Sequence, residues 1–258
     1  MTAPLTDFRS WGGLAARGST IVDARDWLDA PHRPRRPLLA YGNGRSYGDS
    51  CLNDGGTLID ARSLDDILAF DRETGLITCG AGLMLDRLLE IAVPAGWFPP
   101  VTPGTAFVTV GGALANDVHG KNHHGAGTFG CHVRAFELAR SDGQHLICAP
   151  DLNAELFAAT IGGFGLTGLV TQVTLQLMPI ASAEMAQEVL PFDNLARFFE
   201  IAAASDATHD YTVAWIDSLA SGRHFGRGVF FRANHAPASD EPPPRMARSL
   251  PFPLKPPF

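Results

Sequence analysis

Glycine in this chain is gathered into three short stretches, and no other feature limits the possible folds as strongly. Of the 27 glycines, 16 fall within 49 residues: five in 42–56, seven in 104–130 and four in 162–168. Glycine adopts positive φ and lets the main chain approach a neighbour closely, at a cost in chain entropy. The three stretches therefore predict loops that either wrap closely around a ligand or form the tight turns of a β-rich fold.

The overall composition excludes several classes of protein. Of the 258 residues, 45% are apolar and 18% are charged, which provides material for a core and argues against disorder. The formal net charge of -7 speaks against a nucleic-acid partner, because such proteins usually carry a basic excess. Apolar runs stop short of the roughly 18 residues that a membrane span needs. The first residues lack the pattern of a signal peptide, so the expected location is the cytoplasm.

Hydrophobic periodicity and turn residues divide most of the chain into strands and helices. Strands are predicted at 36–41, 57–60, 76–79, 133–140, 144–148 and 173–178, and helices at 83–92 and 152–161, the second capped by Asp151. The alternation of strand and helix before residue 95 is typical of a small α/β unit. Asp142-Gly143, between two of the strands, predicts a hairpin.

A second unit is predicted to begin after Pro179, which closes the last of these strands. It would contain a helix at 194–204 and strands at 211–216 and 228–231. Eight of the 19 prolines fall in 237–257, so this segment is neither an interior helix nor a central strand. We therefore expect two domains, 1–179 and 180–258, of which the second is incomplete because the chain stops inside a connection.

Two nucleotide-binding motifs occur only in part. Residues 163–168 spell G-x-G-x-x-G, but a predicted helix precedes them and a strand follows, which reverses the order that a dinucleotide fold requires. Residues 115–122 approach a P-loop, but Ala115 and Asn122 stand where Gly and Ser or Thr are required. The first segment therefore does not predict a Rossmann dinucleotide site, and the second does not predict a P-loop.

Histidine is concentrated in one loop, where His119, His123, His124 and His132 lie within 14 residues. A zinc site needs three or four converging ligands, and the glycines of this loop argue against a helix that would align His119 with His123. The four cysteines show no C-x-x-C spacing, so no disulfide framework or thiolate zinc site is expected. Three interpretations of the histidine loop stay open. It is a polar loop with hydrogen-bonded imidazoles, it has a catalytic or anion-contacting role, or it binds a metal, which we expect least.

Two segments are rich in small residues that leave main-chain amides accessible. Residues 103–116 pass from a Pro-Gly turn into Thr109-Val-Gly-Gly-Ala-Leu-Ala, and residues 42–48 read Gly-Asn-Gly-Arg-Ser-Tyr-Gly. Small residues allow backbone N–H groups to reach phosphate oxygens, and Arg45 supplies a cation. Two such segments in one domain favour a diphosphate over a single phosphate.

These segments together resemble the flavoprotein family of vanillyl-alcohol oxidase, whose FAD-binding domain is of the PCMH type. The resemblance is carried by residues 41–50, by Pro103-Gly-Thr with Thr109-Val-Gly-Gly, and by residues 162–168. Within the family, residues 117–130 and Arg45-Ser-Tyr-Gly-Asp look most like the oxidases of polyprenyl-phosphoryl ribose. The resemblance implies an α+β fold, in which a two-part FAD-binding domain is followed by an α+β substrate (cap) domain, here incomplete.

The resemblance implies FAD as the cofactor. The binding is expected to be non-covalent, because the first glycine loop has no histidine where some relatives attach the flavin. The residues implied for the FAD site are Tyr41, Gly42, Asn43, Gly44, Arg45, Ser46, Tyr47, Gly48, Asp49, Ser50, Gly104, Thr105, Thr109, Val110, Gly111, Gly112, Asn116, Asp117, Val118, His119 and Val170.

The implied reaction is oxidation of a secondary sugar alcohol to a ketone, with hydride passing to the flavin. The implied substrate is the 2′-hydroxyl of a polyprenyl-phosphoryl ribose, on the way to arabinose. His119, Lys121 and Tyr47 are the implied catalytic residues. Lys121 would also hold the substrate phosphate or stabilise the reduced flavin, and Trp215 would contact the substrate from the cap domain unless it is an ordinary core residue.

In the family a longer chain returns to the FAD domain and supplies a lysine near the flavin. This sequence ends before that return, and Lys255 in its Pro-rich end does not match. We therefore expect the 258-residue chain alone to retain FAD weakly and to turn over little substrate. Family members work with a separate NAD(P)H-dependent keto-reductase, and a lipid-linked substrate suggests a place beside the inner membrane. The alternatives are an oxidase of a soluble polyol or lactone, a non-catalytic flavin-binding fragment and, more remotely, a metal-dependent hydrolase.

Overall fold

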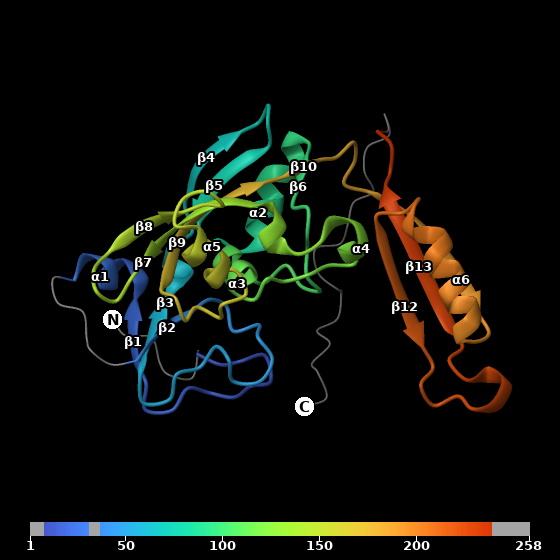
Figure 1. Cartoon of the computed structure of the whole chain (residues 1–258), viewed down its shortest axis with the longest axis horizontal. Coiled ribbons are helices and arrows are strands. Elements are labelled where there is room, and N and C mark those ends of the chain that lie inside the picture. The colour runs from blue at the N-terminus through green and yellow to red at the C-terminus, as the bar shows by residue number, and fades with distance from the viewer. Residues whose placement is uncertain (1–7, 31–36, 239–258) are drawn as a thin grey trace, which may run out of the picture.

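A computed structural model describes residues 8–30 and 37–238, and its first layer is a small parallel sheet (Figure 1). Strands β1 (Thr20–Asp23), β3 (Thr57–Asp60) and β2 (Leu38–Tyr41) pair in that order, all parallel. Helix α1 (Ala24–Asp29) follows β1 directly, because the Asp23 carboxylate accepts a hydrogen bond from the Arg25 amide at 2.8 Å. A small α/β unit is therefore present, but the strand predicted at 76–79 and the helix predicted at 83–92, on which the prediction also rested, belong to the second layer.

The second layer is a five-stranded antiparallel sheet in the order β4-β5-β9-β7-β8. Its strands are β4 (Ile67–Asp71), β5 (Leu76–Gly80), β9 (Leu169–Gln176), β7 (Val133–Ala139) and β8 (His145–Cys148). Helices α2 (Leu85–Ala92), α3 (Val110–Ala115) and α5 (Ala154–Thr160) pack on it, and their apolar side chains share one core with those of β5, β7 and β9. The predicted hairpin is present between β7 and β8, with Gly143 at φ +93°.

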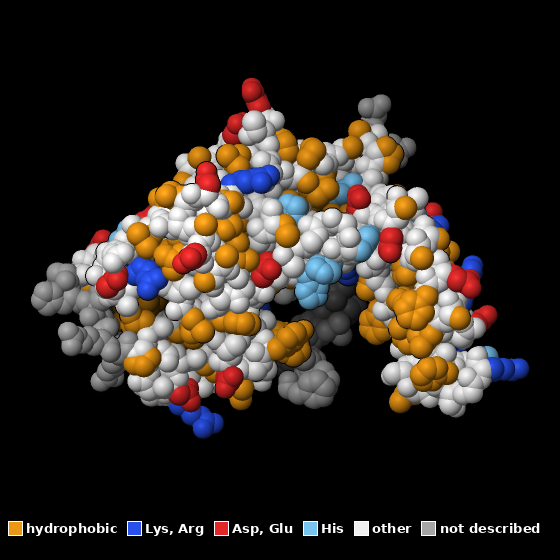
Figure 2. Space-filling model, in the orientation of Figure 1, with side chains coloured by type: hydrophobic (Ala, Val, Ile, Leu, Met, Phe, Trp, Pro, Cys, Tyr) orange, Lys and Arg blue, Asp and Glu red, His pale blue; other side chains and the backbone are white. Residues whose placement is uncertain are grey.

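A third sheet contains only residues that follow Pro179. It is antiparallel in the order β11-β13-β12, with strands β11 (Met185–Phe192), β13 (Gly228–His235) and β12 (Tyr211–Ile216). Helix α6 (Leu195–Asp206) covers its face away from the other sheets (Figure 1). In the same orientation, apolar side chains gather on the surface over this helix and sheet (Figure 2). This connectivity agrees with a division after residue 179, and the division itself stays a prediction.

The remaining elements are short and connect these layers. They are β6 (Trp97–Phe98) paired with β10 (Met178–Pro179), the helix α4 (His123–Ala126), and the 3-10 turns η2 (Ala61–Ser63), η3 (Val93–Ala95), η4 (Phe129–His132) and η5 (Gly222–His224). The loop around α4 meets the third sheet, where the Thr212 amide donates to the Lys121 carbonyl at 2.8 Å. In the part of the chain that the structure describes, none of the helices has the length and apolar character needed to cross a bilayer.

Several predicted boundaries were wrong. The helix predicted at 152–161 begins at Ala154 and is capped by Asn153 in a left-handed conformation, not by Asp151. Strand β9 begins four residues before the predicted strand, at Leu169, and β13 continues past residue 231 to His235. Strands β1, β4 and β11 and helix α3 were not predicted, and α3 contains two glycines that disfavour a helix in isolation. Residue 36, most of the Pro-rich segment and Lys255 lie outside the described residues.

Candidate functional site

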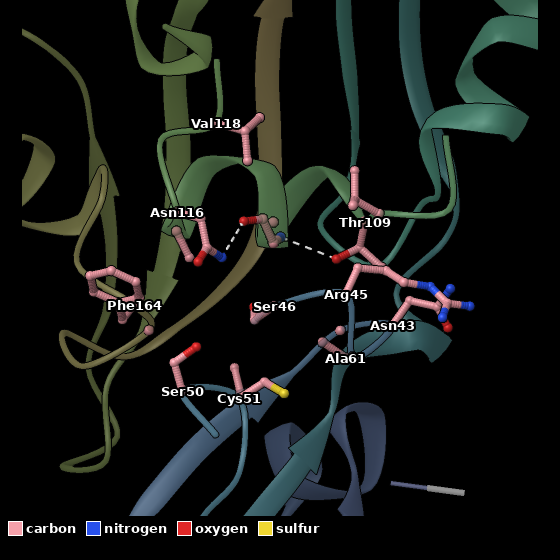
Figure 3. Close-up of a pocket in the computed structure, with 18 of the residues that line it drawn as sticks. Asn43, Arg45, Ser46, Ser50, Cys51, Ala61, Thr109, Asn116, Val118 and Phe164 are labelled. Carbon is pink, nitrogen blue, oxygen red and sulfur yellow. Dashed lines mark hydrogen bonds between the residues drawn. The ribbon is translucent and has the colours of Figure 1, made fainter. Parts of the chain in front are cut away.

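A cavity of about 620 Å³ lies between the parallel sheet, helix α3 and the first residues of β9 (Figure 3). Sixteen of the 21 residues implied for FAD line it: Gly42, Asn43, Gly44, Arg45, Ser46, Tyr47, Ser50, Gly104, Thr105, Thr109, Gly111, Gly112, Asn116, Val118, His119 and Val170. Ligand cavities in proteins have volumes of about 300–1,000 Å³, so this cavity can hold a molecule of dinucleotide size.

The first wall is the loop that follows β2. Gly44 is buried at φ +60°, where a Cβ atom would collide with the Arg9 carbonyl oxygen and the Tyr41 hydroxyl. The amides of residues 43–48 donate to no described residue. The Asn43 side chain donates to the Phe107 carbonyl at 2.8 Å and so joins this loop to the second wall. Residues 43–47 line the cavity, so this loop provides N–H groups without protein partners beside it, as an oxyanion requires.

The second wall is the start of α3, and its amides are already used. The Val110 amide donates to the Leu83 carbonyl at 2.8 Å, and the Gly111 amide donates to the Ala81 carbonyl at 2.7 Å. The Thr109 hydroxyl caps the helix by accepting from the Gly112 amide at 3.1 Å (Figure 3). Within the segment 103–116, the prediction of accessible amides was therefore wrong for residues 110–112. The small residues serve close packing instead, because a Cβ on Gly42 would lie 2.5 Å from the Thr109 hydroxyl oxygen.

The third wall is the glycine loop between α5 and β9. The Gly162 amide donates to the Leu114 carbonyl at 3.0 Å and the Phe164 amide donates to the Ala115 carbonyl at 2.9 Å, so the loop is attached to the end of α3. Phe164, Gly165 and Gly168 face the cavity. The sequence-based list included only Val170 from this region.

Five residues of that list do not line the cavity: Tyr41, Gly48, Asp49, Val110 and Asp117. The Tyr41 ring is buried behind the first wall, where its hydroxyl donates to the Arg9 carbonyl at 2.7 Å, and burial raises its pKa. Val110 is buried in the core, and the Asp117 carboxylate accepts from the Gly130 amide at 2.8 Å. These three side chains support the walls instead of facing the cavity, and Gly48 and Asp49 are exposed.

Other lining residues were not predicted: Trp11, Cys51, Ala61, Ala81, Pro103, Val108, Ala115, Phe164, Gly165, Gly168 and Leu169. Burial raises the pKa of the Cys51 thiol, with a smaller contribution from Asp49, so the thiol is neutral near pH 7. Phe164, Gly165 and Gly168 could have been predicted, because they belong to residues 162–168, a segment that already carried the family resemblance. The small apolar residues of the list have no sequence signal of their own.

The implied catalytic residues separate into two places. His119 and Tyr47 line the large cavity, whereas Lys121 lines a second cavity of about 240 Å³ between the α4 loop and the third sheet. Trp215 lines neither cavity and is 76% exposed, so it is not a core residue. Around Lys121, the Tyr211 hydroxyl lies 3.2 Å from His235 Nε2, and burial raises the pKa of Tyr211 to about 12. The structure therefore does not bring the three implied catalytic residues, His119, Lys121 and Tyr47, to one cavity.

The histidine loop is held by hydrogen bonds to main-chain carbonyls. The rings of His123, His124 and His132 lie 3.2, 3.1 and 2.9 Å from the carbonyl oxygens of Gly127, His209 and Ala126. His119 forms a strand bridge with Thr128, and its ring centroid lies 5.6 Å from that of His123. Over residues 8–30 and 37–238, no three His, Cys, Asp or Glu side chains are grouped to hold a metal. Three of the four histidines thus match the polar-loop reading, and His119 alone faces the large cavity.

Comparison with known proteins matches this chain to a family of FAD-binding domains and to several oxidoreductases. A model of the FAD binding domain family matches residues 15–149. Decaprenylphosphoryl-beta-D-ribose oxidase of Mycolicibacterium smegmatis is 40% identical over 240 residues, which cover 88% of this chain and 51% of the relative. L-gulonolactone oxidase of Mus musculus is 28% identical over 62% of this chain and 36% of its own length. D-lactate dehydrogenase of Anaerostipes hadrus is 28% identical over 55% of this chain and 30% of its own length.

The chain spans about half the length of the first of these relatives and a smaller share of the other two. The family model matches just over half of this chain, and the matched part includes the first and second walls of the large cavity. By this match and by its α+β architecture, the chain belongs to the FAD binding domain family, of the PCMH type, and its cofactor is FAD.

Proposed function

We propose that this chain is the FAD-binding part of an oxidoreductase that converts a secondary sugar alcohol into a ketone. We further propose that the substrate is the 2′-hydroxyl of a polyprenyl-phosphoryl ribose. The observation that carries both is a cavity lined by 16 implied FAD residues in a chain 40% identical to a relative named for decaprenylphosphoryl ribose. Because the chain spans 51% of that relative, the activity and the substrate are both part of the proposal.

The residues present suit the diphosphate of FAD. The amides of residues 43–47, which line the cavity and donate to no described residue, would donate to its oxygens, and the exposed Arg45 forms no ion pair with any described carboxylate. The glycines of the three walls let the main chain approach the cofactor closely. When bound, FAD supplies the acceptor for the hydride and its electron pair.

Two side chains are placed to act beside the cofactor. His119 is exposed and lines the cavity, so its imidazole could accept the proton that the substrate hydroxyl loses. Tyr47 lines the same cavity, and its ring meets that of Trp11 edge-on at 5.2 Å between centroids. We propose that His119 handles the proton and that Tyr47 orients the sugar.

Lys121 and Trp215 are proposed to act on the substrate rather than on the flavin. Lys121 lines the neighbouring cavity with Thr102 of the FAD domain and Tyr211 of the third sheet. Its ammonium group would hold the phosphate of the substrate. We prefer this role to stabilisation of the reduced flavin, because Lys121 does not line the cavity assigned to FAD. Trp215 is exposed on β12 and would contact the substrate from the third sheet.

The test is a single-turnover reduction with enzyme in excess. FAD-loaded chain is mixed without oxygen with a polyprenyl-phosphoryl ribose, while the flavin absorbance is followed and the keto sugar is sought by mass spectrometry. Although this chain alone should turn over little substrate, we expect bleaching and the ketone in a single turnover, and we expect His119→Gln to slow the reduction by about 100-fold or more. His124→Gln is the matched control, because its ring bonds to the His209 carbonyl and lines neither cavity.

The alternatives predict different outcomes of the same experiment. Relatives named L-gulonolactone oxidase favour a lactone or soluble polyol as the second candidate substrate. Reduction by such a compound, but not by the lipid-linked sugar, would replace our substrate. Bound flavin that no sugar reduces would instead indicate a flavin-binding chain without catalysis.

The cellular setting of the reaction follows from its chemistry. A lipid-linked substrate places the reaction beside a membrane, and we propose a cytoplasmic location at the inner membrane surface. A ketone product needs a reducing partner to complete epimerisation, which we propose is a separate NAD(P)H-dependent keto-reductase. Fractionation of cells with and without a salt wash tests the first proposal, and co-purification of a reductase activity tests the second.

A further inference from the structure

Phe164 has an unusual backbone for a large side chain. Its φ is +53°, and it shares a positive φ only with Asp117 and Asn153 among the described non-glycine residues. Asp and Asn tolerate this region because their short polar side chains can bond locally, whereas a bulky L residue there is strained. Strain of this kind persists only where the surroundings enforce it, and it is concentrated at functional sites.

The surroundings of Phe164 do enforce its position. Its amide donates to the Ala115 carbonyl at 2.9 Å, next to the bond that joins the Gly162 amide to Leu114. Gly162 and Gly165 on either side have φ of +69° and +78°. A Cβ on Gly163 would collide with the Ala159 carbonyl oxygen. These bonds and glycines therefore hold residue 164 beside the end of α3.

The Phe164 side chain has few packing contacts with the described part of the protein. It is 53% exposed, it stacks with no other described ring, and it belongs to none of the apolar clusters of the described residues. It does line the large cavity, on the side opposite Asn43 and Arg45 (Figure 3). A strained aromatic residue without packing partners at a cavity wall points to a planar ligand group.

The neighbourhood of Phe164 distinguishes between the two ring systems of FAD. Its neighbour Gly165 approaches Ala40 and Leu39, and the adjoining wall is Leu169 and Val170, all without titratable side chains. His119 instead leads into Lys121 and the α4 loop, which extends toward the third sheet, while the loop after α5 lies on the other side of α3 (Figure 1). Because we propose that His119 takes the proton of the substrate, the ring that accepts hydride belongs on the His119 side, which leaves the other ring for Phe164.

We propose that Phe164 is the platform on which the adenine ring of FAD stacks, and that the strained loop exists to present it. This inference rests on FAD as the ligand of the large cavity. Stacking of a base on an aromatic side chain typically contributes about 5-fold to 150-fold in affinity. Phe164 is therefore a positioning residue for the cofactor and takes no part in the chemistry.

The test measures binding of FAD, ADP and FMN to the flavin-free 258-residue chain by calorimetry. We expect Phe164→Ala to lower the affinity for FAD and for ADP by at least about 5-fold and to leave the affinity for FMN unchanged. Phe164→Tyr should bind FAD and ADP as tightly as the unchanged chain does. Leu166→Ala is the matched control, because Leu166 is 79% exposed in the same loop and does not line the cavity. Equal weakening of FMN, or unchanged affinity for ADP, would overturn the proposal.

A second variant separates stacking from folding. Glycine adopts positive φ without strain, so Phe164→Gly should keep or raise the thermal unfolding midpoint while it weakens FAD and ADP as much as Phe164→Ala does. A lowered midpoint would mean that Phe164 is a structural residue. If the unchanged chain binds neither FAD nor ADP, the assignment of FAD to the large cavity fails together with the role of Phe164; if the unchanged chain and the variants bind both equally well, only the role of Phe164 fails.

Discussion

Replacement of Gly44 by alanine should damage this protein more than any other single methyl group added to the first loop. Gly44 is buried at φ +60°, and a Cβ there would meet the Arg9 carbonyl oxygen and the Tyr41 hydroxyl. The Tyr41 hydroxyl cannot move aside freely, because it donates to the Arg9 carbonyl at 2.7 Å and accepts from the Arg9 amide at 3.1 Å. The added atom must therefore displace main chain or break two hydrogen bonds.

The magnitude has two parts. A non-glycine residue in the left-handed region costs about 1–2 kcal/mol, and an extra group in a packed site typically costs about 1–3 kcal/mol. Gly44→Ala should therefore lower the free energy of unfolding by about 2–5 kcal/mol. Gly48→Ala is the matched control, because Gly48 has φ +64° in the same loop but no atom within 4 Å of its would-be Cβ. Gly48→Ala should lower the free energy of unfolding only by the cost of a left-handed backbone, about 1–2 kcal/mol.

The assay is urea denaturation of the flavin-free chain, followed by tryptophan fluorescence and analysed at a common m-value. FAD binding is then titrated at a urea concentration where each variant is folded. Because Gly44 positions the amides of residues 43–48, Gly44→Ala should also weaken FAD, while Gly48→Ala should weaken it less. Equal losses of stability in the two variants would refute the steric argument, and unchanged FAD affinity in Gly44→Ala would refute the role of this loop.

Three further outcomes are expected. Arg45→Gln should weaken FAD about 5-fold to 10-fold, with an effect that shrinks as salt is added, because a charge-assisted bond to a diphosphate is partly screened; an affinity that is unchanged in low salt would place the diphosphate elsewhere. Acid or organic solvent should release all flavin from the chain, since the first loop has no histidine for attachment, and flavin left on the protein would contradict this. Burial raises the pKa of Tyr211 to about 12; because an unfolded tyrosine ionises near pH 10, stability should fall by about 1–2 kcal/mol between pH 10 and 12. Tyr211→Phe should remove that fall in an alkaline denaturation series, and a series with the same slope would assign it to other groups.

Local sequence patterns predicted the elements that have a clear period or a strong breaker. Strands β2, β3 and β5 and helix α6 lie close to their predicted positions, because apolar alternation and capping residues act over a few residues. Strand β11 escaped prediction because most of its residues are exposed, so it has no buried face to impose a period of two. Helix α3 escaped because its stability comes from the Thr109 cap and from packing, which offset two glycines.

The sequence by itself determined which segments line the cavity, because glycine gathers at residues 42–48, 104–112 and 162–168, and at Gly42, Gly44 and Gly163 a Cβ atom would collide with a neighbouring residue. The tertiary structure alone decided which amides remain available: those of 43–48 are free of described partners, while those of 110–112 are consumed by Leu83, Ala81 and Thr109. It also separated Lys121 from His119, two residues apart in the chain but in different cavities. Hydrogen-bond partners and cavity walls come from residues far apart in sequence, so no local pattern encodes them.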